Sequence, residues 1–247
     1  MDIELKHIAF PVDLNQPDKN VYFKLDIDGT GQTKLMRPEQ VMAFSLQKIS
    51  NSFIKDGKTS NDMVISVPPY MGHTERRAYL DAAKIAGINC LRLMNDSSAT
   101  ALQYGHRNKS EFIDQAPRTV CFIDFGHSYV SLTLVNFFAK KATILYQNNM
   151  RNLGGRDIDY LIYQLLSEEF TKKYGDDPRE SPKCKLRLLE MIEKKRKTLS
   201  SNKTTDFLME CLLNDNDLSR EMSRDEFEKI LSPLMELFFE FLFHSVG

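Results

Sequence analysis

Short runs of alternating apolar and polar residues open the chain and then give way to a helical pattern. Residues 1–36 contain such runs, separated by turn residues such as Gly29, and this arrangement predicts a small antiparallel β element. From Pro38 onward the apolar residues recur at near-helical spacing until Asp56-Gly57. A proline suits the first turn of a helix, so we predict that a helix begins at Pro38.

The next stretch predicts helices layered on a sheet. Met63–Val67 is a short β-branched run that ends at Pro68-Pro69, because a central strand does not continue through two prolines. Thr74 is a candidate N-cap for the following helix, and Gly87 is suited to close that helix in the left-handed conformation. Strand, helix, strand and helix follow closely, which is typical of a layered α/β lobe. Their predicted ranges are 63–67, 75–86, 88–94 and 97–105.

A polar connector that ends at Pro117 leads into a second β region. The pattern there predicts three strands in meander order, two helices, a further strand, a turn and a last helix. Ser223, with Glu226 three residues later, is a capping signature for the last helix. The predicted ranges are 119–123, 129–137 and 142–147 for the meander, 157–173 and 183–199 for the helices, 206–212 for the further strand and 214–217 for the turn.

Composition and charge are those of an ordinary globular protein. Hydrophobic residues make up 42% and charged residues 27% of the 247 residues. A net charge of −1 gives no reason to expect nucleic acid or an anionic membrane as a partner. Cys90 and Cys121 lie in apolar runs, which predicts small buried thiols. The sequence shows no secretory signal and no stretch long enough to span a bilayer, so we expect a cytoplasmic protein, with the nucleus as the alternative.

The segment Phe122–Ser128 carries the most informative candidate chemistry. Asp124 ends an apolar strand, and Gly126 lies in the turn that leads to the next strand. Backbone N–H groups in such a turn can bind a phosphate, while a carboxylate orients Mg²⁺ through water. Asp and Gly are also common in ordinary hairpin turns, so the turn alone leaves both interpretations open.

Two later segments are compatible with the same chemistry. Gly154-Gly155 precede a helix, and two glycines allow close backbone approach and free amides that attract an anion. A simple loop-to-helix turn is the other interpretation. The basic helix that ends at Ser200 is either a solvated face or a surface that packs on a flat ring, with Glu193 and Ser200 bonding a base or ribose.

The order and spacing of these segments are more specific than any one of them. The series runs through Val67–Tyr70, Glu75–Arg77, Asp81–Asn95 and Asp96–Gly105, then the turn at Asp124, Gly154–Asp157 and the helix that ends Leu199-Ser200-Ser201. It resembles, in this order, the first connecting motif, the second phosphate loop, the next glycine pair and the adenosine-contacting helix of the Hsp70 superfamily of heat shock chaperones. The resemblance covers the chain from about Pro38 to Leu234.

Two details resemble the large Hsp110 branch of that superfamily. The turn reads Gly126-His127-Ser128-Tyr129, where ATPase members carry a glycine-rich turn with a following threonine. Asn214–Ser219 is also similar to a motif of the large branch. Asp96 stands where the ATPase pattern has a glutamate. Each added Cβ narrows a phosphate cradle, so binding survives these changes more easily than turnover, which depends on positioning.

The resemblance implies a partial α/β protein with an actin-like ATPase (ribonuclease H-like) fold in two lobes. It implies a small β subdomain over 1–36 and an α/β part over 37–116 in lobe I, then a β-meander over 117–153 and a mainly helical subdomain over 154–247 in lobe II. It implies ATP or ADP with Mg²⁺ as cofactor of the full-length parent. By resemblance, Asp124 and Asp96 orient the metal and water, and the nucleotide contacts are Gly126, His127, Ser128, Tyr129, Gly154, Gly155, Glu193, Arg196, Lys197 and Ser200.

The function implied by the large branch is that of an ATP-binding chaperone. Such a protein holds unfolded clients and promotes nucleotide exchange on an Hsp70 chaperone partner. Two alternatives stay open: an ATP-hydrolysing chaperone of the ordinary Hsp70 branch, and an inert fragment. We expect an incomplete domain, because the family's first phosphate hairpin and its Gly-Gly-x-x-Arg segment have no counterpart in the chain. Uncovered sheet edges and apolar faces are then expected in both lobes.

Overall fold

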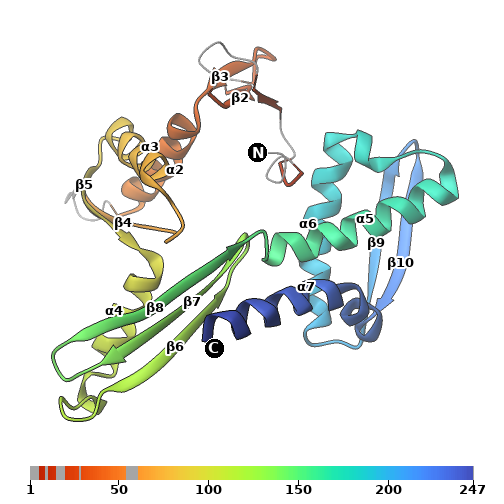
Figure 1. Ribbon diagram of the computed structural model, residues 1–247. Coiled ribbons are helices and arrows are strands. Elements are labelled where there is room, and N and C mark those ends of the chain that lie inside the picture. The colour runs from red at the N-terminus through yellow and green to blue at the C-terminus, as the bar shows by residue number, and fades with distance from the viewer. Residues whose placement is uncertain (1–5, 9–10, 15–19, 28, 54–60, 247) are drawn as a thin grey trace. The chain divides into compact units, whose positions relative to one another are not determined.

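The computed structural model is a mixed α/β structure (Figure 1). It describes residues 6–8, 11–14, 20–27, 29–53 and 61–246. The predicted helix end at Asp56-Gly57 lies outside the described residues. Contacts divide the chain into two units, which we call the N-terminal unit (Phe10–Phe122 and Thr133–Gln147) and the C-terminal unit (residues 1–9, 123–132 and 148–247). The fourfold domain division expected from the sequence stays a prediction.

The N-terminal unit begins with the antiparallel element that the sequence predicts. Strands β1 (Val12–Asp13), β2 (Tyr22–Leu25) and β3 (Lys34–Met36) form one sheet in that order. In its register Phe23 lies opposite both Val12 and Met36. Helix α2 (Pro38–Ser52) follows with Pro38 in its first turn, as predicted.

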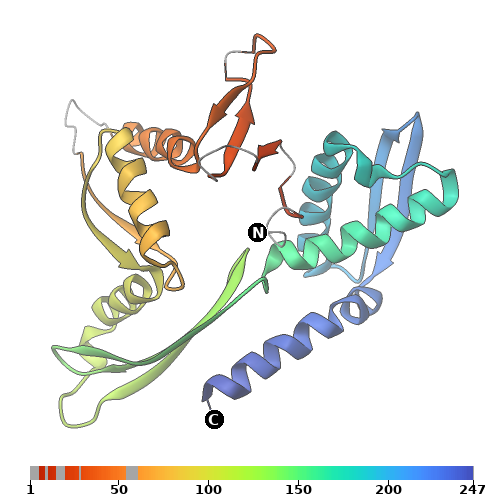
Figure 2. The same cartoon turned by 45° about the horizontal axis from the view of Figure 1, so that its top comes forward.

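The predicted layered α/β arrangement is confirmed in the rest of this unit. Strands β4 (Asp62–Val67) and β5 (Asn89–Asn95) pair in parallel, and helix α3 (His73–Ile85) connects them. Helices α2 and α3 lie side by side against this pair (Figures 1 and 2). Their shared core contains Leu46, Ala82, Ala83 and Ile88.

The ends of α3 test two sequence predictions. Gly87 has a φ of +74°, the left-handed conformation that a helix C-terminus favours, and this prediction is confirmed. The predicted N-cap, Thr74, is wrong, because the helix begins at His73 and Gly72 is its N-cap. No side chain caps this end, so the sequence carried no capping signal to find.

Helix α4 (Asp96–Arg107) packs on an aromatic cluster. Tyr104 lies with Phe112, Phe122 and Phe137, and the rings of Phe112 and Phe137 stack with centroids 5.0 Å apart. The short 3-10 helix η1 (Lys109–Glu111) follows α4 and leads toward β6. Helix α4 therefore extends two residues beyond its predicted end at Gly105.

The predicted meander is confirmed as β6 (Arg118–Phe125), β7 (Tyr129–Phe137) and β8 (Ala142–Arg151), paired in that order. The central strand β7 is the most buried of the three. One face of β6 is exposed, so the prediction of a buried Cys121 is wrong and its thiol side chain is exposed. Cys90 is half-buried.

The C-terminal unit has its own core between helices and a hairpin. Helices α5 (Gly155–Tyr174) and α6 (Pro182–Leu199), joined through the 3-10 helix η2 (Pro178–Glu180), pack against β9 (Thr204–Leu213) and β10 (Asn216–Ser223). Figure 1 shows this hairpin beside α6. Fully buried members of the core are Ile162, Leu166, Leu188, Ile192, Phe207 and Met222.

Strand β10 is an element that the sequence pattern does not predict. Only Leu218 and Met222 of its eight residues are apolar, and the predicted turn over 214–217 covered its first two positions. Only Asn214 and Asp215 form the turn, and both have positive φ, as a two-residue hairpin loop requires. Asp217 instead accepts a hydrogen bond from the Cys211 N–H at 2.7 Å.

The last helix, α7 (Arg224–Val246), begins as predicted. The Ser223 hydroxyl accepts a hydrogen bond from the Glu226 N–H at 3.2 Å, which confirms the capping signature. The side chain of Phe238 on α7 meets that of Phe125 edge-on, with ring centroids 5.3 Å apart. None of the helices in the described part of the chain has the length and apolar character of a membrane span.

The core of the C-terminal unit can be tested with two leucines. Leu166→Ala removes a fully buried side chain between α5 and the hairpin, and we expect the free energy of unfolding to fall by about 3 kcal/mol. Leu186→Ala is the control, because 51% of that side chain is exposed and its loss costs less than about 0.5 kcal/mol. Urea denaturation of the two variants measures the difference; equal losses would contradict this core.

Candidate functional site

The turn between β6 and β7 rests on the N-terminus of α5. The N–H groups of Gly155 and Arg156 donate to the carbonyls of Gly126 and His127 at 3.0 and 2.9 Å. The Asn152 N–H donates to the Ser128 carbonyl at 3.2 Å. The first amides of a helix lack partners within the helix, and here the turn supplies them. Two segments that the sequence singled out are therefore brought together.

Gly154 makes this close approach possible. A Cβ on Gly154 would lie 2.4 Å from the His127 carbonyl oxygen and 2.8 Å from the Ser128 nitrogen. A Cβ on Gly155 would meet its nearest neighbour, an Arg196 nitrogen, at an ordinary 3.5 Å. Of the two glycines, Gly154 is the one that contact with the turn requires.

The free donors lie on the turn and at Gly154, the N-cap of α5. Of the two amides predicted at Gly154-Gly155, that of Gly155 is engaged by the turn, whereas that of Gly154 has no acceptor among the described residues. Among the described residues, the N–H groups of His127 and Ser128 have no hydrogen-bond acceptor. Two successive free N–H groups in a turn form a concavity that suits an anion.

Asp124 lies next to this turn, near the end of β6. Its side chain is exposed, and the described residues give it neither a hydrogen bond nor an ion pair. A Cβ built on Gly126 would lie 4.0 Å from an Asp124 carboxylate oxygen. A free carboxylate beside free amides can orient a hydrated cation bound to an anion.

Helix α6 supplies the other side of the site. The Arg196 guanidinium donates two hydrogen bonds to the carboxylate of buried Asp159 on α5, from Nε at 2.5 Å and from Nη2 at 3.2 Å. This bidentate pair joins the two helices. Glu193 and Lys197 form an exposed ion pair at 2.6 Å, and the hydrogen bond from Lys197 lowers the pKa of Glu193. The Ser200 hydroxyl donates to the Lys197 carbonyl at 2.7 Å.

A cavity of about 170 Å³ lies between the turn and α6. His127 and Glu193, both named from the sequence, line it. Lys197 and Ser200 are exposed about one and two turns beyond Glu193 and do not line it. The structure therefore brings the turn, the glycine pair and part of the predicted adenosine helix to one place in the C-terminal unit.

Several residues of this cavity were not foreseen. Arg156, Asp159 and Glu190 line it, and so does His7. His7 and Lys6 lie 3.3 and 3.7 Å from the Asp157 carboxylate. Arg156 was visible in the motif that follows the glycine pair, whereas nothing in the sequence around His7 indicated a contact with α5.

Residues 6–8 contact both α5 and α6. The ring of His7 meets that of Tyr160 edge-on at 5.5 Å, and the Lys185 ammonium donates to the Ile8 carbonyl at 2.9 Å. Burial lowers the pKa of Lys185. These contacts place His7 at the wall of the cavity.

Two predicted residues remain: Tyr129 begins β7 and its carbonyl accepts a hydrogen bond from the Gly126 N–H at 3.0 Å, whereas Asp96 belongs to the N-terminal unit. Asp96 is the first residue of α4, and its carboxylate accepts a hydrogen bond from the Ser97 N–H at 2.5 Å. Its partnership with Asp124 in orienting metal and water stays a prediction.

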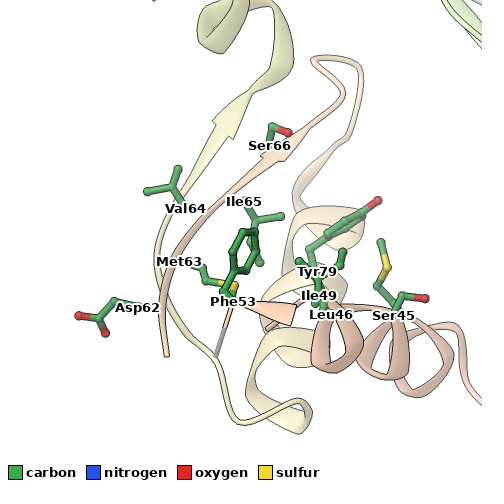
Figure 3. Close-up of a pocket in the computed structure, with 11 residues that line it drawn as sticks. Ser45, Leu46, Ile49, Phe53, Asp62, Met63, Val64, Ile65, Ser66 and Tyr79 are labelled. Carbon is green, nitrogen blue, oxygen red and sulfur yellow. The ribbon is translucent and has the colours of Figure 1, made fainter. Parts of the chain in front are cut away.

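A larger cavity of about 540 Å³ in the N-terminal unit is of a different kind. Figure 3 shows Met63 and Ile65 of β4 facing Leu46 and Tyr79, with apolar side chains around them. Among the described residues, no lysine or arginine lines it, and its one carboxylate, Asp62, accepts a hydrogen bond from Asn89. This cavity lacks the charged donors that a phosphate favours.

The site in the C-terminal unit fits a nucleotide with a divalent cation. Free N–H groups at His127 and Ser128 suit a phosphate, and the Asp124 carboxylate suits a hydrated Mg²⁺. The described residues contain no cluster of three or more histidines, cysteines or carboxylates placed to hold a metal ion alone. Residues 1–243 match the family model described as Hsp70 protein.

The chain belongs to the Hsp70 family.

Curated relatives agree with this assignment. The chain is 35% identical over 223 residues to a 97 kDa heat shock protein of Strongylocentrotus purpuratus, covering 89% of the chain and 25% of that protein. It is 34% identical over 208 residues to a heat shock protein homolog of Saccharomyces cerevisiae, covering 83% of the chain and 30% of that protein. It is 33% identical over 236 residues to heat shock 70 kDa protein 16 of Arabidopsis thaliana, covering 95% and 31%.

The family resemblance expected from the sequence is thereby confirmed, including its likeness to large heat shock proteins. The mixed α/β architecture agrees with a partial Hsp70 nucleotide-binding domain of the actin-like ATPase fold. The Hsp70-family chain spans between a quarter and a third of the length of these relatives.

Neighbouring glycines test the turn of this Hsp70-family chain. Gly154→Ala places a methyl group against the His127 carbonyl, so we expect a loss of about 1–3 kcal/mol in the free energy of unfolding. We also expect faster amide hydrogen exchange at Arg156, whose N–H bonds to that carbonyl. Gly155→Ala is the matched control and should leave both quantities nearly unchanged. Equal effects at the two positions would contradict the close approach.

Proposed function

We propose that this chain is the nucleotide-binding part of an ATP-binding chaperone of the Hsp110 type. The observation that carries this proposal is the turn at His127-Ser128, whose free N–H groups lie beside the free carboxylate of Asp124. A turn with a purely structural role would also satisfy the first amides of α5, so the feature that favours the nucleotide site is the pair of free N–H groups beside the free carboxylate.

In this proposal the residues of the site have separate roles in binding the nucleotide. His127 and Ser128 donate N–H groups to phosphate oxygens, and Asp124 orients Mg²⁺ through its water ligands. The bound Mg²⁺ neutralises phosphate charge. Glu193, Lys197 and Ser200 offer hydrogen bonds to the base or ribose, while Arg196 positions α6 through Asp159. Gly154 holds the turn close to α5.

The same turn favours binding over turnover. His127 and Tyr129 each carry a Cβ and a large side chain where the ATPase pattern has small residues. Added bulk in a phosphate cradle shifts the nucleotide by fractions of an ångström, and phosphoryl transfer depends almost wholly on position. We therefore propose a nucleotide-binding protein with little or no ATP hydrolysis.

The likeness to the 97 kDa heat shock protein supports a role beside an Hsp70 chaperone. We propose that the whole protein promotes nucleotide exchange on that partner and holds unfolded client proteins, in the cytoplasm. The competing role is that of an ATP-hydrolysing chaperone of the ordinary Hsp70 branch. The bulk of the His127-Ser128-Tyr129 turn argues against this role.

Loss of the Asp124 carboxylate tests the metal-dependent part of binding. With a fluorescent ATP analogue and Mg²⁺, we expect Asp124→Ala to raise Kd about tenfold, because the hydrated cation loses its anchor. In EDTA the variant and the wild type should bind alike. Asp206→Asn, at an exposed position on β9, is the control and should keep wild-type affinity. Absence of saturable binding by the wild type would leave the inert-fragment alternative.

Exchange activity needs a separate measurement. A labelled nucleotide is loaded on an Hsp70 chaperone, and its release is followed after the chain is added. We expect faster release with the wild type and no steady ATP turnover. Unchanged release together with intact ATP binding would reject the exchange role while keeping the nucleotide site. Steady turnover would favour the ATP-hydrolysing alternative.

A further inference from the structure

A second cavity of the N-terminal unit lies between the end of α4 and the turn that joins β7 to β8. Its volume is about 320 Å³, enough for one large apolar side chain. Its base contains Phe112 and Phe137, and Leu102 and Phe138 lie at its rim. The helix approaches closely because Gly105 has no side chain: a Cβ there would lie 2.9 Å from the Phe137 ring.

The rim of this cavity is basic. Lys109 lies on one side, Lys140 and Lys141 lie in the turn on the other, and His106 belongs to the last turn of α4. Among the described residues, no aspartate or glutamate lines the cavity, and none of the ion pairs uses these three lysines.

Of the two carboxylates nearby, one is paired with an arginine and the other keeps its charge beside the turn that carries Lys140 and Lys141. Glu111 pairs with Arg118, and Asp114 accepts a hydrogen bond from the Ala139 N–H at 3.0 Å. The Lys141 ammonium lies 5.9 Å from the centroid of the Phe138 ring. Three ammonium groups thus surround an apolar cavity while the whole chain has a net charge of −1. The lysines at this rim therefore outnumber the unpaired carboxylate beside it, which favours a ligand with negative charge.

We propose that this cavity, which we call the basic-rim pocket, docks an acidic peptide segment through one apolar side chain. The apolar side chain would fill the space above Phe112 and Phe137, and acidic residues on either side would meet Lys109, Lys140 and Lys141. Apolar burial supplies affinity, and the charges select an acidic over a basic segment. This binding is independent of the nucleotide site, which lies on α5, α6 and the turn at His127.

The aromatic residues favour a peptide over nucleic acid. Single-stranded nucleic acid binds by stacking its bases on exposed aromatic faces. Phe112 and Phe137 are only 6% and 2% exposed and stack on each other, so neither offers a free ring face. Together with Leu102 and Phe138 they instead line an apolar cavity that a leucine or phenylalanine side chain can enter.

Fluorescence anisotropy with short labelled peptides tests the proposal on the 247-residue chain. The first peptide has a central leucine flanked by glutamates, the second has lysines in place of the glutamates, and the third has serine in place of the leucine. We expect saturable binding of the first alone, weakening as salt is raised. Equal binding of the lysine peptide would overturn the charge selection, and equal binding of the serine peptide would overturn the apolar anchor.

Charge reversal on the surface locates the binding. The double variant Lys140→Glu with Lys141→Glu should raise the Kd of the acidic peptide about tenfold. The control is Lys172→Glu with Lys173→Glu, an exposed pair at the end of α5 that should change little. Leu102→Ser should also weaken binding, and its side chain is 63% exposed, so folding is preserved.

Two results would reject the basic-rim pocket. One is equal loss of affinity in both charge-reversal variants, which would indicate nonspecific attraction. The other is tighter binding of an oligouridylate than of the acidic peptide, which would indicate a nucleic-acid surface. Titration with the fluorescent ATP analogue should be unchanged in the Lys140 and Lys141 variant, so failure here and failure of the nucleotide site are distinguishable.

Discussion

The hydrogen bonds between the turn at Gly126-His127 and the first amides of α5 fix the geometry of the candidate site. The carbonyls of the turn satisfy helix amides that have no partner within the helix. Because those carbonyls point into α5, the N–H groups of His127 and Ser128 are left for another acceptor. One contact therefore both stabilises the helix N-terminus and leaves donors free on the turn. It forms only because Gly154 leaves room for the backbone of the turn.

The rest of the C-terminal unit supports this contact. Arg196 joins α6 to Asp159 of α5, so the helix that carries Glu193 keeps its position beside the turn. Behind them, Leu166, Leu188 and Phe207 form a core that is closed to solvent. A nucleotide site built on helices with a packed core can hold a ligand in one position. The bulk of His127 and Tyr129 then decides how well that position suits phosphoryl transfer.

Much of the fold follows from local sequence signals, and the failures have physical causes. Proline at the start of α2, Gly87 after α3 and Ser223 before α7 each impose a local conformation, and the structure has all three elements. Strand β10 was missed because the predicted turn over 214–217 was too long. The hairpin loop consists of Asn214 and Asp215 alone, so the strand begins within the predicted turn. The exposure of Cys121 depends on which face of β6 is covered, and local pattern does not contain that information.

The sequence predicted which segments form the candidate site, but it did not predict which hydrogen bonds join them. The order of motifs located the turn, the glycine pair and α6, because each has a recognisable local sequence. The donors differed in part: the Gly155 amide is engaged by the turn, and the free amides among the described residues here are those of Gly154, His127 and Ser128. His7 reaches the cavity through a contact with Asp157, far away in the sequence. Such pairings arise from tertiary structure alone.

The central claim, that the turn at His127-Ser128 receives the phosphates, can be tested at single amides. Nitrogen-15 NMR spectra of the chain would be recorded while Mg²⁺ and ADP are added. We expect the amide signals of His127 and Ser128 to shift strongly, and those of Gly155 and Arg156, already bonded to the turn, to shift little. Nucleotide binding that leaves the His127 and Ser128 amide signals in place would contradict this account.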